Sequence, residues 1–91
     1  MRVDLARDAD VAALVRSTDG ESLVVMIGAD RDAVLLAQAQ AAIGPLAAAV
    51  APCRRVNAVV VGASATADSV AAIVAFLESA SSTTGQVVSV S

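Results

Sequence analysis

Histidine, lysine, tyrosine and tryptophan are all missing from this chain of 91 residues. Without histidine and lysine it has no imidazole base, no Ser-His-Asp or Cys-His nucleophile, no Schiff-base amine and no Walker-type phosphate loop. The metal sites that depend on histidine are removed as well. These absences exclude most of the common catalytic constellations.

Aromatic and basic residues are scarce too. Phe76 is the only aromatic residue, all six cations are arginine, and the formal net charge is −3. Binding to nucleic acid needs a basic surface or aromatic platforms on which bases stack. We therefore expect no nucleic-acid partner.

Cys53 is the single cysteine, so an internal disulfide and a Cys-x-x-Cys motif are both excluded. The first eight residues mix charges and contain no apolar signal core, and we expect a cytoplasmic protein. The run from Ala33 to Pro52 is long enough to span a membrane. Its two glutamines and its central Gly44-Pro45 pair favour a buried helix instead, so no membrane contact is expected.

Apolar residues are abundant, at 57% of the chain, whereas charged residues make up 16%. A domain this short buries only about 60–65% of the surface that its unfolded chain exposes. Residues 1–91 therefore read as a single small domain with more apolar surface than its own core can cover. A partner surface is the expected destination for the excess.

Three apolar runs predict strands, at 23–27, 56–61 and 87–90, and a weaker strand is expected at 2–5. These runs do not alternate with polar residues, which is typical of parallel strands covered on both faces. Helices are predicted between them, over 11–17, 33–51 and 68–78. The order predicts an α/β fold, a small three-layer Rossmann-like domain with about four parallel strands and three helices.

Acidic and hydroxyl residues precede each predicted helix and suit its N-cap. The candidates are Asp8 or Asp10 for the first helix, Asp30 for the second, and Ser64 or Thr66 for the third. Gly44-Pro45 conflicts with one uninterrupted helix, because proline removes a backbone hydrogen bond and clashes with the preceding turn. We expect a kink or a break there.

The long helix is apolar nearly all round, which predicts that it is covered on more than one side. One side can pack on the sheet, and the other then needs a partner. Strands in sequential order with right-handed crossovers would place every helix on one sheet face. Either one helix crosses to the other face or a partner covers it.

Several segments resemble short-chain dehydrogenases/reductases (SDRs). Residues 55–62 (RVNAVVVG) followed by Thr66 are similar to the family's RVNAVxPG…T segment, and 70–90 resemble its VAxAVxFLxS…TGQ ending. Residues 46–52 resemble the end of the family's long helix, and 3–11 resemble its VDVTDxxxV stretch. The likeness is good over 40–91, the family's C-terminal half, and loose over the first 35 residues.

The family's chemistry is absent from these residues. The glycine-rich turn that cradles the pyrophosphate is missing, and so is the catalytic Tyr-x-x-x-Lys, whose positions fall near Asp32 and Leu36. The resemblance places Asp4 near the adenine and Gly62 and Thr66 near the nicotinamide, so the latter two are the candidate cofactor residues. Thr66 is also explained as a helix cap alone. No catalytic or metal-binding residue is assigned.

The expected function is that of a non-catalytic SDR-like subunit with a structural or regulatory role. It would form a homo-oligomer, or a hetero-oligomer with a full-length NAD(P)-dependent SDR, and hold no cofactor by itself while NAD(P) binds the partner. The alternatives are a minimal NAD(P)- or acyl-CoA-binding module and a membrane-associated peptide. The candidate interface residues are Ala41, Ala42, Ile43, Leu46, Ala49, Val50, Phe76 and Leu77.

Each of the other polar candidates allows both a functional and a structural interpretation. Asp30 and Asp32 could form an acid/base pair, but their spacing favours partners of a helix N-terminus. The pair Arg54-Arg55 could bind a phosphate, although arginines that flank a strand are usually solvated. Asn57 lies on an apolar strand, where satisfying neighbouring backbone groups is the simpler role.

Overall fold

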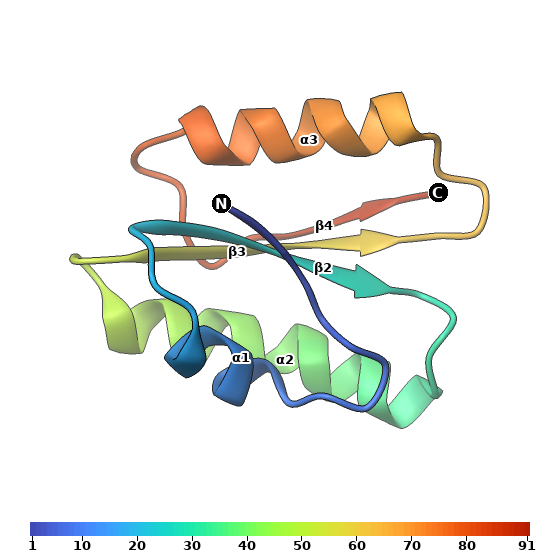
Figure 1. Cartoon of the computed structure of the whole chain (residues 1–91), viewed down its shortest axis with the longest axis horizontal. Helices are drawn as coiled ribbons and strands as arrows, with labels where there is room; N and C mark the ends of the chain where they lie inside the picture. Colours follow the sequence, from blue (N-terminus) through green and yellow to red (C-terminus); the bar gives the residue numbers. More distant parts are fainter.

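The computed structural model describes residues 1–91 as four strands and three helices (Figure 1). In chain order these are β1 (Arg2–Asp4), α1 (Val11–Ser17), β2 (Ser22–Gly28), α2 (Ala33–Val50), β3 (Arg55–Val61), α3 (Ala67–Ser79) and β4 (Val87–Val90). Each predicted strand and helix is present close to its predicted bounds. The weak N-terminal strand is confirmed as the short β1.

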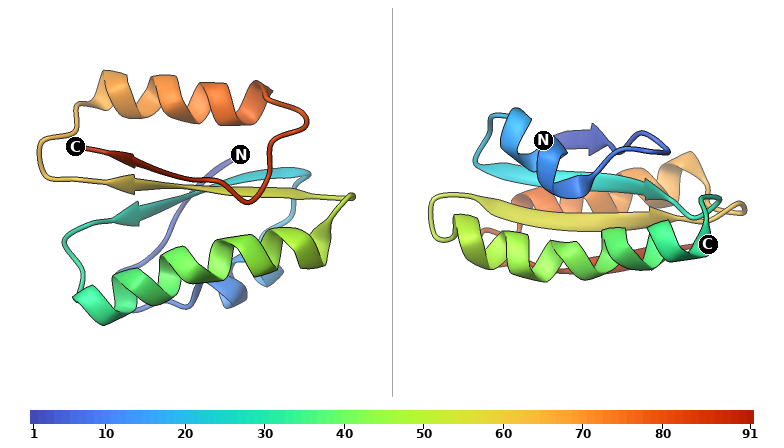
Figure 2. Two further views of the ribbon diagram at one scale, coloured as in Figure 1. Left: turned by 180° about the vertical axis from the view of Figure 1, so that it is seen from behind. Right: turned by 90° about the horizontal axis from the view of Figure 1, so that it is seen from below.

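The strands form one parallel sheet in the order β1-β2-β3-β4. Helices α1 and α2 cover one face of this sheet and α3 covers the other (Figures 1 and 2). The predicted three-layer, Rossmann-like α/β arrangement is therefore confirmed.

The two central strands supply side chains to both faces. Leu23, Val25 and Ile27 of β2 belong to a cluster with α1 and α2, whereas Val24 and Met26 pack with α3. The same alternation continues in β3, and the five middle residues of each of these strands are buried. Continuous apolar runs thus correctly indicated strands covered on both sides.

The third crossover has the opposite hand from the first two. The four strands are parallel and in sequential order, so helices on opposite faces require connections of opposite hand. The connections through α1 and α2 are right-handed, as nearly all such crossovers are, and β3-α3-β4 is left-handed (Figure 2). Of the two arrangements expected from the sequence, the one in which a helix crosses to the other face is correct.

The sequence predicted a kink or a break at Gly44-Pro45; helix α2 runs through both residues, so the predicted break is wrong. Both residues are exposed, as is Ala41, whose carbonyl loses its helical partner because Pro45 has no N–H. Water can solvate that carbonyl on the exposed side. Packing of the opposite side through Ile43 on the sheet keeps the helix continuous.

Each helix begins at a side-chain cap. Asp10 accepts a hydrogen bond from the backbone N–H of Ala13, and Asp32 accepts from those of Val34 and Leu35. The sequence had suggested Asp30 as the cap of α2, but the cap is Asp32. The Asp30 carboxylate instead pairs with Arg7 at 2.6 Å on the exposed surface.

Candidate functional site

The carboxyl ends of the four parallel strands meet at one edge of the sheet, where ligands of open α/β sheets generally bind. Two cavities open near this edge, one on each face. The larger, of about 410 Å³, lies on the α3 side. It is lined by Arg2, Asp4, Leu5, Met26, Gly28, Val61, Ala65, Thr66, Ala67 and Val70.

Thr66 combines a structural role with a place in this cavity. Its hydroxyl oxygen accepts a hydrogen bond from the Ser69 backbone N–H at 3.1 Å and lies 2.9 Å from the Ser69 hydroxyl. The predicted cap at the start of α3 is therefore confirmed, and much of the hydroxyl's hydrogen-bonding capacity is already used. The Thr66 hydroxyl can therefore offer a ligand only a small polar contact at the cavity wall.

Gly62 does not line the cavity. Its N–H donates to the Val90 carbonyl at 2.7 Å, and a Cβ placed on it would lie 3.1 Å from the same oxygen. A side chain at this position would push against the end of β4. The structure thus gives Gly62 a packing role, and it does not bring Gly62 and Thr66 together on the cavity wall.

A dinucleotide pyrophosphate has no cradle at this edge. Gly28, the last residue of β2, is the only glycine between this strand and the next helix, and that helix begins with Asp32 on the N–H groups that would meet a phosphate. A carboxylate there repels an anion. The residues present do not fit the pyrophosphate of NAD(P).

The acidic residues here do not form a catalytic pair either. Asp32 caps α2, while Asp30 is held by Arg7 on the surface. Nor does any group of three His, Cys, Asp or Glu side chains come together to hold a metal ion.

Arg54 and Arg55 are bound by backbone carbonyls, so the expectation that both are solvated was wrong. Arg54 donates to the carbonyls of Val15, Thr18 and Gly20 around the end of α1. Arg55 donates to four carbonyls around the end of α3, namely those of Leu77, Glu78, Ala80 and Thr83. Both guanidinium groups sit at the negative ends of helices, where a cation is stabilised.

Asn57 is fully buried on β3, and its amide pairs with backbone groups as expected. Its Nδ2 donates to the Thr83 carbonyl at 3.1 Å, and its Oδ1 accepts from the Gln86 N–H at 3.0 Å. These bonds anchor the loop that leads into β4.

The predicted interface residues fall into two groups. Ile43 and Leu77 are buried in the core, facing the sheet from opposite sides, so they cannot line an external contact. Ala42, Leu46 and Val50 are half-buried against the core, whereas Ala41, Ala49 and Phe76 are exposed. The prediction failed for Ile43 and Leu77 because the apolar pattern of α2 and α3 does not separate the sheet side from the solvent side.

A continuous exposed strip follows the side of α2 that faces away from the sheet. We call it the α2 outer face; it consists of Val34, Ala37, Gln38, Ala41, Pro45, Ala48 and Ala49. No charged residue occurs anywhere from Ala33 to Val50. By length and composition alone α2 would also be able to cross a membrane, although core helices pass the same test.

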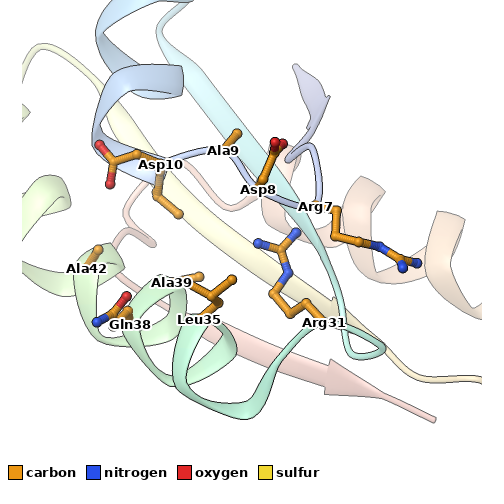
Figure 3. A pocket seen from close by; sticks show the side chains of 10 residues that line it. Arg7, Asp8, Ala9, Asp10, Arg31, Leu35, Gln38, Ala39 and Ala42 are labelled. Carbon is orange, nitrogen blue, oxygen red and sulfur yellow. The ribbon is translucent and has the colours of Figure 1, made fainter.

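Arg31 is a buried cation that the sequence analysis did not single out. It is the only cation between Arg16 and Arg54 and it lies between two aspartates, a signal that could have drawn attention to it. Its guanidinium borders the second cavity, of about 160 Å³, near the loop before α1 and the start of α2 (Figure 3).

A comparison with protein families matches residues 4–90 to the SDR-like family, described as short chain dehydrogenase-like protein. The chain belongs to this SDR-like family. The match includes residues 4–35, a stretch over which the sequence resemblance was only loose. Neither the curated proteins nor the solved structures gave a match. The membership of this SDR-like chain therefore rests on the family comparison, and the α/β sheet agrees with it.

Proposed function

We propose that this SDR-like chain is a non-catalytic subunit that acts by assembly through the α2 outer face. The observation that carries the proposal is an exposed, uncharged and largely apolar strip along an 18-residue helix. Only Ala39, Ile43 and Ala47 of that helix are buried by the chain itself. Exposed apolar surface of this extent is typical of an interaction site.

A second copy of the chain is the occupant that fits this face best. A two-fold axis brings the same patch of two subunits together, so the patch must be complementary to itself. The α2 outer face meets this condition because it has no charge that would repel its own copy. Its alanines also let two helix backbones approach closely.

The residues of the chain support a role in binding another subunit more than a role in catalysing a reaction. The Tyr and Lys that act as catalytic pair in SDR enzymes have no counterpart, and the sheet edge lacks a pyrophosphate cradle. A full-length SDR carries an equivalent helix by resemblance and is the second partner that this face would accept. In such a complex NAD(P) would bind the partner.

The test is the molar mass in solution of the wild type and of Ala41→Arg. Ala41 is exposed at the centre of the α2 outer face, so the arginine should disrupt assembly without disturbing the core. We expect light scattering to give about twice the 9.0 kDa chain mass for the wild type and the single chain mass for the variant. Ala71→Arg, on exposed α3, is the matched control and should remain assembled.

Two results would contradict the proposal. One is a wild-type monomer at every concentration that also fails to co-purify with a full-length SDR from its native host. The other is sedimentation of the wild type with membranes after lysis, which would assign α2 to lipid.

A second candidate function rests on the cavity on the α3 side. Asp4, Met26 and Thr66 bring a carboxylate, a thioether and a hydroxyl to its wall, which suits a nucleoside or acyl-CoA fragment better than a whole dinucleotide. Calorimetric titration with adenosine and with S-acetylpantetheine, fragments of NAD(P) and acetyl-CoA that lack the pyrophosphate, tests it. A saturable heat of binding that is lost in the Asp4→Asn variant would support this function. The absence of any heat of binding would exclude it.

A further inference from the structure

Arg31 is only 8% exposed and has no carboxylate partner. Its Nε donates to the Gly28 carbonyl at 3.3 Å, and its Nη2 donates to the carbonyls of Leu5 and Ala6 at 3.1 and 3.3 Å. These bonds tie the loop after β1 to the loop after β2. They satisfy hydrogen bonds but leave the positive charge without a counter-ion.

The other arginines bound by carbonyls differ from Arg31 in their surroundings. Arg54 and Arg55 lie at helix C-termini, where the helix dipole compensates a positive charge. Arg31 lies directly before the N-terminus of α2, where the same dipole opposes a cation. The nearest carboxylates in the sequence, Asp30 and Asp32, are engaged by Arg7 and by the α2 cap.

One nitrogen of Arg31 remains free. The hydrogen bonds of the guanidinium group come from Nε and Nη2, whereas Nη1 makes none and is not fully buried, so it is open to the 160 Å³ cavity that the group borders (Figure 3). A buried charge normally has a paired group, so a free guanidinium nitrogen at a cavity points to an anionic group that comes from outside. Guanidinium binds carboxylates with strong, charge-assisted hydrogen bonds.

The remaining walls restrict the size and polarity of the ligand. Leu35, Ala39 and Ala42 of α2 supply an apolar wall. A large or highly charged anion does not fit a cavity of this volume beside the carboxylates of Asp8 and Asp10. The Asp10 carboxylate caps α1, whereas that of Asp8 has no partner in the chain.

We infer that the Arg31 cavity binds a small aliphatic carboxylate. The carboxylate accepts from Arg31 Nη1, and the aliphatic part lies against Leu35, Ala39 and Ala42. The cavity lies between the loop before α1 and the first half of α2, and Gln38 is the one residue of the α2 outer face that also lines it. Binding in the cavity is measured separately from assembly, so the two proposals can fail independently.

Titration with isovalerate and with valine, followed by amide NMR shifts, tests the inference. Both ligands carry a carboxylate on a short branched chain, and isobutylamine is the control that lacks the carboxylate. We expect saturable shifts near Arg31 for one or both acids, with a dissociation constant on the order of 1 mM, as for other very small ligands. Equal binding of the two acids would identify the carboxylate and the short branched chain as the recognised groups, whereas weaker binding of valine would identify the simple acid as the ligand class.

Two variants separate binding from folding. Arg31→Gln should abolish binding, but it also removes the ties to Leu5 and Ala6 and could unfold the chain. Ala42→Leu leaves those ties in place and fills the cavity, so it should weaken binding at least tenfold, while the exposed control Ala71→Leu should not. Unchanged affinity in folded Ala42→Leu, shifts that chloride reproduces, or no shift with either acid would overturn the inference.

Discussion

Arg54 and Arg55 are adjacent in the sequence but fasten opposite sides of the molecule. Arg54 reaches the end of α1 on one face of the sheet, and Arg55 reaches the end of α3 on the other. The alternation of side chains along an extended chain explains the divergence. Arginine suits both positions because its planar fork offers several donors at fixed angles, which a lysine ammonium does not.

Replacing Arg55 by alanine should lower the free energy of unfolding by about 2–3 kcal/mol, the usual loss for hydrogen bonds to a charged group. Lysine should rescue little of this, because one ammonium cannot reach all four carbonyls. Urea denaturation measures the change. Arg16→Ala is the matched control, since Arg16 is exposed and makes no hydrogen bond or ion pair; equal losses for Arg16 and Arg55 would contradict the assigned role.

At the scale of the element, two glycines next to each other in space have opposite requirements. Gly44 lies inside α2 with nothing within 4 Å of the Cβ that it lacks. Gly85, in the loop before β4, has a φ of +78°, and a Cβ placed on it would lie 3.6 Å from the Ala47 Cβ. A helix interior favours alanine over glycine, whereas positive φ favours glycine.

The same substitution should therefore change stability in opposite directions at these two positions. Gly44→Ala is expected to raise the free energy of unfolding by about 1 kcal/mol, and Gly85→Ala to lower it by roughly 1–2 kcal/mol. Thermal unfolding would show a shift of about 4–8 °C per kcal/mol for a domain of this size. Changes of the same sign in both variants would show that the loop before β4 does not hold Gly85 in this conformation.

The elements themselves were well predicted from the sequence, and the reason is local. Residues 23–27 are all apolar, residues 56–61 are apolar except for Asn57, and caps such as Thr66 act within one turn. Pro45 misled the prediction because its effect depends on which side of α2 it occupies. That side is set by packing on the sheet, which the order of residues near Pro45 does not reveal.

At the scale of the whole molecule, long-range contacts decided what the sequence left open. The left-handed β3-α3-β4 connection brings together residues that are more than twenty positions apart. The hydrogen bonds of Arg54 and Arg55 do the same. The Arg31 cavity likewise brings together the loops after β1 and β2. No local pattern encodes these contacts. The family resemblance had assigned Gly62 and Thr66 to one cofactor site, whereas in the structure Thr66 lines the cavity on the α3 side and Gly62 does not.

Assembly through the α2 outer face should make thermal stability depend on protein concentration. A partner that binds only the folded chain stabilises it by mass action. We expect the Tm of the wild type to rise over a hundredfold increase in concentration, while that of Ala41→Arg stays constant. Calorimetry or circular dichroism measures this; a concentration-independent Tm for the wild type would argue against self-association.

Pro45 leaves one polar atom in the middle of that face. The Ala41 carbonyl cannot receive the N–H that a residue other than proline would offer it, and a dry interface would leave the oxygen unsatisfied at a cost. A neighbouring helix must bring a donor to this point, as an amide such as Gln38 could, or leave room for a water molecule. In the proposed assembly this requirement would restrict how one helix can slide along the other, so a single oxygen would fix the alignment that alanines alone would leave ambiguous.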